Sequence, residues 1–368
     1  VPHLSSLSIR SFRGLFDANL EEFARINLIT GLNGAGKSGI LEAAFLICAP
    51  EQPENTLAIN GMRGIDSFRI SAETMNDTPW DNMFAWGDDV RNPVDISCVT
   101  SDGLRVNLQM EIVSDERELR RRVPDATRTP SKLATAFDFS AGRALRYKVR
   151  RSNKLTERIL FIDDGRVRSE PKSGTPIIQA ALRISSGRTD RETIAERFSK
   201  FEMEGEVPSL VESLRFIEPR LCDLGLVFSK PSPTVVADIG LPKRLPVAFL
   251  GQGFGTVLQM LIDMRLADNG ILLLDEVENG LHHSVMRDVW LTLDSWARKY
   301  DTQIIATTHS LECIEAAFDA LAAKPGDEDA DPLRVFRLSR TPSGSVTPIR
   351  EYSSGGLTAA LDAGLEVR

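Results

Sequence analysis

One eight-residue segment constrains this chain more than any other: Gly31-Leu-Asn-Gly-Ala-Gly36-Lys37-Ser38. It fits the pattern GxxxxGK[ST] of the phosphate-binding loop, or P-loop. The apolar run INLIT precedes it, and SGILEAAFLI, whose apolar residues are spaced as in a helix, follows it. In this strand–loop–helix order, glycine N–H groups and a helix N-terminus close around phosphate oxygens. The segment therefore predicts a nucleotide site on an α/β fold.

The residues of this loop have separate expected tasks. Lys37 is expected to reach the β- and γ-phosphates, and the Ser38 hydroxyl is expected to ligate Mg²⁺. The residues predicted to surround the phosphates are Asn33, Gly34, Ala35, Gly36, Lys37, Ser38 and Gly39.

A second motif follows much later in the chain. The apolar run Ile271-Leu-Leu-Leu ends in two acids, Asp275 and Glu276, which is the Walker B pattern. Unpaired carboxylates are costly to remove from water, so two of them at the end of a buried strand point to function. Asp275 is predicted to hold Mg²⁺, and Glu276 is predicted to polarise the attacking water.

A single histidine follows the next strand-like run, QIIATT. His309 lies in Ala306-Thr-Thr-His-Ser310, 34 residues after Asp275. A histidine at a strand end is usually a turn residue. Its position on the next predicted parallel strand makes it a candidate to donate a hydrogen bond to the γ-phosphate.

In this order, the P-loop, a long insertion, a glycine-rich turn, LLLDE and THS resemble an ABC-type ATPase. The segment LSSLSIRSFRGLFDANL before the P-loop, and DEVENGLHHS at the second motif, are similar to the SMC/RecF/OLD-like branch rather than to transporter ATPases. The segments PVAFLGQGFGTVLQML and ATTHSLECIEAA are similar to single-chain ATPases of bacterial defence systems. The resemblance covers nearly the whole chain and is most specific at 26–47 and 247–315.

The resemblance implies that two ATPase heads enclose two ATP molecules with Mg²⁺. Gly251 and Gly253, in LGQGFG, stand where the family has its LSGGQ signature loop, although no serine occupies the second position. A helix is predicted from Thr256. Arg13 matches a family position near the nucleotide, with a surface arginine as the alternative.

Three further assignments concern loops around the nucleotide. The Q-loop is not placed, and residues 60–64 are a weak candidate for it. His282 and His283 are adjacent, so on a helix their rings would point apart by about 100°. A role in the D-loop at a dimer interface is expected for them rather than a metal pair.

The predicted fold is an ABC-type P-loop NTPase with a mixed sheet, an antiparallel β-subdomain and a small inserted helical lobe. The ATPase lobe is predicted at 1–185 and 247–368, and the helical lobe with its connection at 186–246. The chain after His309 is too short for the TOPRIM nuclease domain of OLD nucleases. No heptad pattern is long enough for SMC coiled-coil arms. A stand-alone ATPase head is therefore expected.

Composition and charge set the remaining limits. No apolar run approaches the roughly 20 residues of a membrane span. The four cysteines are scattered, which argues against a disulfide framework or zinc site and favours the cytoplasm. The net charge is −8, yet Arg117–Arg183 holds 17 Lys and Arg against 7 Asp and Glu. This segment is either a solvated face of paired charges or a surface for nucleic acid or an acidic partner.

Two functions remain open from the sequence. The first is an ATPase that dimerises around ATP and Mg²⁺, as a homodimer or within a higher homo-oligomer, and regulates or scaffolds a separate effector or nuclease. Bacterial phage defence is implied by resemblance. The alternative is a RecF-like clamp that grips DNA in repair or maintenance. The residues expected to form its footprint are Arg120, Arg121, Arg122, Arg150 and Arg151.

Overall fold

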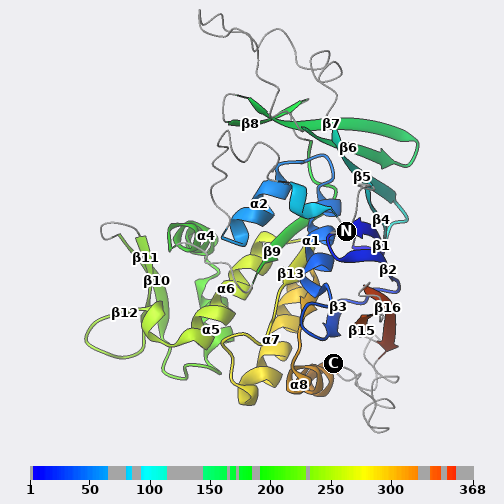
Figure 1. Cartoon of the computed structure of the whole chain (residues 1–368). Helices are drawn as coiled ribbons and strands as arrows, with labels where there is room; N and C mark the ends of the chain where they lie inside the picture. Colours follow the sequence, from blue (N-terminus) through cyan, green and yellow to red (C-terminus); the bar gives the residue numbers. More distant parts are fainter. Residues whose placement is uncertain are drawn as a thin grey trace, which may run out of the picture.

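The computed structural model describes residues 3–64, 80–84, 93–113, 144–163, 166–170, 174–184, 191–228, 233–321, 332–340 and 346–353. Its main feature is a 13-stranded sheet with the order β8-β7-β6-β5-β4-β1-β2-β16-β15-β3-β14-β13-β9 (Figure 1). The sheet has an antiparallel part, from β8 to β2, and a parallel part, from β15 to β9. This confirms the predicted mixed sheet with antiparallel strands attached.

The antiparallel part follows the alternating runs of the sequence. Its strands are β1 (Leu4–Phe12), β2 (Leu15–Leu20), β4 (Val94–Thr100), β5 (Arg105–Val113), β6 (Ala144–Arg151), β7 (Lys154–Asp163) and β8 (Arg166–Glu170). In β4 the burial alternates strictly, with Val94, Ile96, Cys98 and Thr100 buried. One face therefore packs on the core, and the other faces solvent. The hairpin expected at Asp163-Asp-Gly165 joins β7 to β8.

The parallel part is covered on both faces. It contains β3 (Ile26–Gly31), β14 (Gln303–Thr307), β13 (Gly270–Leu274), β9 (Gln179–Arg183) and β15 (Leu333–Arg340), and β15 forms a hairpin with β16 (Val346–Ser353). Every residue of β3, β13 and β14 is buried. In β13, Ile271 and Leu273 face one core, whereas Leu272 and Leu274 face the other.

The first of these cores lies between the two parts of the sheet. Helix α1 (Lys37–Cys48) packs there against β1 and β4 on one side and against β3, β13 and β14 on the other. Helix α2 (Asn55–Met62) and the short helix η2 (Asp81–Met83) lie beside it, in a segment without a helical pattern of apolar residues. The P-loop helix is therefore enclosed by strands on both sides.

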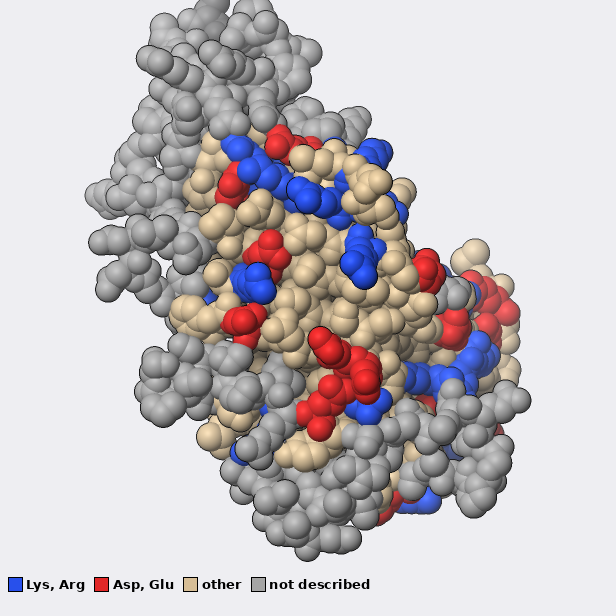
Figure 2. All heavy atoms as spheres, turned by 90° about the vertical axis from the view of Figure 1, so that its right-hand side faces the viewer, with Lys and Arg blue, Asp and Glu red and all other residues tan. Residues whose placement is uncertain are grey.

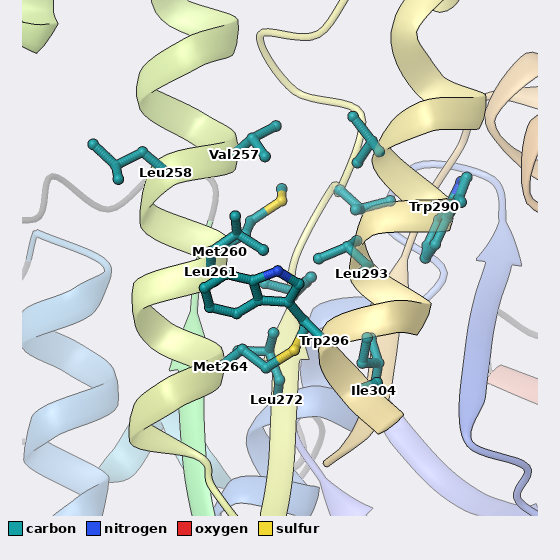
Figure 3. Packing of buried hydrophobic residues seen from close by; sticks show 14 of the residues in the cluster. Val257, Leu258, Met260, Leu261, Met264, Leu272, Trp290, Leu293, Trp296 and Ile304 are labelled. Carbon is teal, nitrogen blue, oxygen red and sulfur yellow. The ribbon is translucent and has the colours of Figure 1, made fainter. Parts of the chain in front are cut away.

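The second core lies under α6 (Gln252–Leu266), α7 (Met286–Lys299) and α8 (Leu311–Leu321). Figure 3 shows Trp296 of α7 lying against Leu261 and Met264 of α6. Trp290 and Trp296 are buried, as is Trp80 in the first core. Trp86 lies outside the described residues.

The lobe predicted as helical at 186–246 also contains strands. Helices α4 (Arg191–Glu204) and α5 (Val207–Leu214) pack with a three-stranded antiparallel sheet of β10 (Asp223–Phe228), β11 (Pro233–Asp238) and β12 (Leu245–Pro246). The lobe therefore has the expected helices, together with a small sheet that was not expected. In the run SKPSPT, which was expected to be a connection, Pro233 and Thr234 begin β11, and residues 229–232 lie outside the described part of the chain.

Candidate active site

The P-loop turns at the carboxyl end of β3 and leads into α1. Its glycines are required by geometry: Gly34 and Gly36 have φ values of 72° and 92°, a region that side chains disfavour. A Cβ atom on Gly31 would lie 2.5 Å from the carbonyl oxygen of Leu338, so only glycine fits there. Asn33 and Gly34 are exposed, whereas Ala35 and Gly39 are buried, with Gly39 packed against Leu15. The loop therefore has the predicted conformation and presents its middle to solvent.

Lys37 lies back across this loop. Its Nζ donates hydrogen bonds to the carbonyl oxygens of Gly31, at 2.6 Å, and Leu32, at 3.2 Å. Burial lowers the pKa of Lys37, and the carboxylates of Asp275, Glu276 and Glu278 oppose that shift. The Lys37 ammonium is poorly solvated and is bonded to carbonyl oxygens, which are neutral. It can therefore exchange these partners for an anionic ligand.

The P-loop and the end of β13 meet through side chains. The Ser38 hydroxyl donates to the Asp275 carboxylate, with distances of 2.9 Å to Oδ1 and 3.1 Å to Oδ2. Thr307, at the end of β14, donates from Oγ1 to Asp275 Oδ1 at 2.8 Å. Thr307 Oγ1 also accepts a hydrogen bond from the backbone N–H of Glu276, at 2.8 Å. Thr307 thus ties the two acids together, a role that the sequence analysis missed.

Glu276 has a backbone conformation that few residues adopt. Its φ is 49°, in the left-handed region where a non-glycine residue is strained. The turn is held because the Asp275 N–H donates to the Arg183 carbonyl at 2.9 Å and the Val277 N–H donates to the Thr307 carbonyl at 3.0 Å. Strain that flanking hydrogen bonds maintain is a feature of functional sites.

His309 is held by an acid that the sequence analysis did not single out. Glu278 Oε1 lies 3.0 Å from His309 Nδ1 and accepts the His309 backbone N–H at 3.0 Å. The imidazole is half exposed, whereas Glu278 is mostly buried. These two contacts from one carboxylate orient the imidazole ring. Nε2, the second ring nitrogen, takes part in neither contact. The run DEVENG contains three acids, and the sequence alone did not mark the third as the partner of His309.

Arg13 is not a surface arginine. It is mostly buried, and its Nη1 lies 2.9 Å from Oε2 of Glu42, a fully buried acid of α1. Arg63, within the candidate Q-loop segment, contacts the other oxygen of Glu42 at 2.5 Å. Burial lowers the pKa of Arg13 and raises that of Glu42, and the ion pairing opposes both shifts. These contacts bind Arg13 and Arg63 to the P-loop helix and leave neither side chain free at the surface.

Comparisons with known proteins identify similar sequences and folds. Residues 238–315, which include Glu276 and His309, match the family described as "AAA domain, putative AbiEii toxin, Type IV TA system". A Helicobacter pylori protein named "ATP/GTP phosphatase" is 22% identical over 345 residues, which are 85% of this chain and 86% of that protein. The chain is a P-loop ATPase.

Two solved structures of SMC heads also align with the ATPase. One is a head domain with an extended coiled coil bound to the C-terminal domain of ScpA from Pyrococcus furiosus, with 12% identity, 99% of each chain covered and a TM-score of 0.49. The other is an SMC head bound to the C-winged helix domain of ScpA, with 12% identity, 98% and 100% coverage and a TM-score of 0.48.

The turn that contains Gly251 and Gly253, which we call the signature-like turn, differs from its prediction in one respect. Helix α6 begins at Gln252 and not at Thr256, so Gly253 and Gly255 lie in its first turn. Gly251, with a φ of 93°, is the residue before the helix. Local propensity misled the prediction, because glycines are poor helix formers. A Cβ on Gly253 would lie 3.2 Å from the carbonyl oxygen of Gly280, so the signature-like turn packs directly on the loop after Glu276.

The adjacent histidines of the ATPase also differ from their prediction. His282 precedes the short 3₁₀ helix η6 (His283–Val285), so the 100° spacing of an α-helix does not apply. The two rings lie 4.1 Å apart, and Ser284 donates its backbone N–H to His282 Nδ1 at 3.3 Å.

Among the described residues, no group of three or more His, Cys, Asp or Glu is arranged to hold a metal ion. No described helix is long and apolar enough to cross a membrane.

Proposed function

We propose that this ATPase binds ATP with Mg²⁺ at the P-loop, dimerises around the nucleotide and thereby controls a separate effector protein. The observation that carries the nucleotide chemistry is the contact of Ser38 with Asp275, two oxygen ligands from separate elements brought within 3.1 Å. Hard oxygen ligands in small number suit Mg²⁺, which takes its remaining ligands from phosphates and water. Bound Mg²⁺ would offset the charge that develops on the phosphates.

The remaining groups have defined tasks in hydrolysis. The Lys37 ammonium would leave the Gly31 and Leu32 carbonyls for the phosphates, and the loop from Asn33 to Gly39 would supply backbone donors. Glu276, fixed by its strained turn, would orient and deprotonate water. His309, oriented by Glu278, would donate from Nε2 to the γ-phosphate. Each assignment follows from the position of a side chain at the carboxyl ends of β3, β13 and β14.

Dimerisation is supported by the surface beside this site. Gly251 and Gln252 of the signature-like turn are exposed, as are His282 and His283 in the adjoining loop. In a two-fold dimer each head would present this surface to the P-loop of the other. Control of an effector in a toxin–antitoxin or phage-defence setting is supported by the wording of the matched family description and by the resemblance to defence ATPases.

The experiment uses Glu276→Gln, which keeps the shape of the side chain but cannot accept a proton. We expect ATP binding to be retained, turnover to fall at least tenfold, and sedimentation with ATP to show a dimer. Lys200→Gln, an exposed change on α4, is the matched control and leaves all three unchanged. Wild-type turnover of Glu276→Gln excludes its role, and a monomer with bound ATP excludes the dimer.

The alternative, a RecF-like DNA clamp, depends on the basic segment. Arg120, Arg121 and Arg122 of the expected footprint lie outside the described residues. Arg150 and Arg151 lie on β6. Within the described part of the chain neither of these two residues forms an ion pair with an acid, and this favours the alternative.

A further inference from the structure

One buried acid of the P-loop helix has no task in the proposed hydrolysis. Glu42 of α1 has no exposed surface, and it pairs with Arg13 at 2.9 Å and with Arg63 at 2.5 Å. On the face shown in Figure 2, by contrast, acidic and basic side chains lie at the surface, where water and salt screen their charges. We call Glu42, Arg13 and Arg63 the Glu42 cluster. A buried charge is costly unless its partners balance it, and this cluster keeps one positive charge in excess.

The Glu42 cluster lies one helical turn from the proposed metal ligands. Residues four apart lie on the same face of a helix, so Glu42 is next to Ser38, whose hydroxyl bonds to Asp275 Oδ1 at 2.9 Å. Burial raises the pKa of Glu42, its two arginines oppose that shift, and the Asp275 carboxylate adds to it. The two acids therefore lie close enough for their charges to act on each other.

The arginines of the Glu42 cluster have bonding capacity left. Arg13 Nε is buried and has no hydrogen-bond partner within the part of the chain that the structure describes. Arg13 Nη2 bonds to the sulfur of Met83, a weak acceptor, at 3.6 Å. Burial lowers the pKa of Arg13, Glu42 opposes that shift, and the charge of Arg63 lowers the pKa further. If the charge of Glu42 were lost, these guanidinium groups would be drawn to the Asp275 carboxylate.

We propose that Glu42 is a positioning residue, which holds Arg13 and Arg63 away from Asp275 and so leaves that carboxylate available to Mg²⁺. Guanidinium groups and Mg²⁺ compete for carboxylate oxygens, because both bind them strongly. While Glu42 holds the two cations, Asp275 keeps its bond with Ser38. The inference rests on the proposed binding of ATP with Mg²⁺ at this site.

A second buried acid with two arginines provides a matched control. Asp263 of α6 is buried and contacts Arg197 at 2.5 Å and Arg183 at 3.7 Å. Helix α6 packs on the face of the sheet opposite to α1. Asp263→Asn therefore also leaves two arginines without their acid, but it does so on the other side of the sheet from Ser38.

The test measures binding of the non-hydrolysable ATP analogue AMP-PNP to the full chain by calorimetry, in EDTA and at increasing Mg²⁺. For Glu42→Gln, the half-saturating Mg²⁺ concentration should rise about tenfold, because a released guanidinium group pairs with Asp275, while affinity in EDTA does not fall. Arg63→Gln removes one competing cation at a partly exposed position and should lower that concentration by about twofold. Glu42→Gln/Arg63→Gln restores the net charge and should recover most of the loss. Asp263→Asn should stay within about twofold of the wild type.

Several results would overturn this role of Glu42. An equal rise for Glu42→Gln and Asp263→Asn would show a general effect of arginines without their acid. An equal loss of affinity in EDTA and in Mg²⁺ would indicate a deformed P-loop. If Glu42→Gln does not fold, Arg63→Gln decides, because a raised Mg²⁺ requirement there contradicts competition. A wild type that does not bind AMP-PNP with Mg²⁺ contradicts the proposed function as well, whereas unshifted variants of a binding wild type contradict the role of Glu42 alone.

Discussion

The parallel and antiparallel parts of the sheet place polar chemistry in opposite ways. In the parallel part both faces are covered, by α1 on one side and by α6, α7 and α8 on the other. Its polar groups are therefore confined to strand ends, where Lys37, Asp275 and Thr307 meet. In the antiparallel part only one face is covered, so Ser8, Ser97 and Asn107 lie along the open face.

The difference shows that one sheet can present two kinds of polar surface. Chemistry that needs few, fixed groups fits the strand ends of a buried sheet, because the core prevents them from moving. Contact with a long ligand needs a row of similar groups, which an open face provides. Helix α1 lies between the two parts, which are joined within the sheet by the pairing of β16 with β2.

The largest expected contrast is in stability. Leu272→Ala on β13 removes a fully buried side chain and should lower the free energy of unfolding by about 3 kcal/mol. Ser97→Ala on the open face of β4 should change it by less than about 0.5 kcal/mol. Urea unfolding of both variants measures this. Equal losses would mean that the two parts are covered alike.

A second prediction concerns the strand ends. Lys37→Ala should lower ATP affinity by about a hundredfold or more, because the cation that faces the phosphates is lost. The fold should persist, since the side chain bonds only to loop carbonyls. Calorimetric titration with ATP is the measurement, with Lys200→Ala as the control. Unchanged affinity in Lys37→Ala would contradict the role of the P-loop.

A smaller effect is expected at Thr307. Thr307→Val keeps the shape but removes the hydroxyl that joins Asp275 to the Glu276 backbone. Turnover should fall about tenfold, equivalent to about 1.4 kcal/mol of transition-state stabilisation, while ATP affinity changes less than threefold. Thr302→Val, which removes a buried hydroxyl bonded to the Ala267 carbonyl, is the control for stability alone. A tenfold loss in both variants would show a general effect of buried hydroxyls.

The smallest perturbation is thiol labelling at pH 8. Cys48, Cys98 and Cys313 are buried, and burial raises the pKa of both Cys98 and Cys313 to about 12. The nucleophilic thiolate is therefore scarce in both parts of the sheet. Cys222 is exposed, so one thiol per chain should react quickly and three only in denaturant. Fast reaction of Cys98 would show that the antiparallel part opens.

Local patterns in the sequence were sufficient for most of the sheet. The alternation in β4 and β5, the apolar runs of β13 and β14, and the P-loop glycines each specify their own element. The sequence also identified Asp275, Glu276 and His309, because each follows a buried strand. The order of the motifs along the chain indicated that these three residues belong to one site.

The rest depends on contacts between distant residues. Thr307 bonds to Asp275 across 32 positions, and Arg13 reaches Glu42 only because β1 and α1 pack together. The first turn of α6 forms on glycines, against their propensity, because Gly253 must approach Gly280 closely. No local pattern encodes such approaches.

The left-handed backbone of Glu276 has an evolutionary consequence. A glycine there would adopt the φ of 49° without strain, so Glu276→Gly should be the more stable protein, by about 1 kcal/mol, and catalytically dead. Selection for stability therefore favours glycine at position 276, whereas selection for turnover favours glutamate. A descendant that kept nucleotide binding but no longer needed hydrolysis would be free to drift toward glycine or asparagine. The residue at this position should therefore indicate whether a lineage was selected more strongly for stability or for turnover.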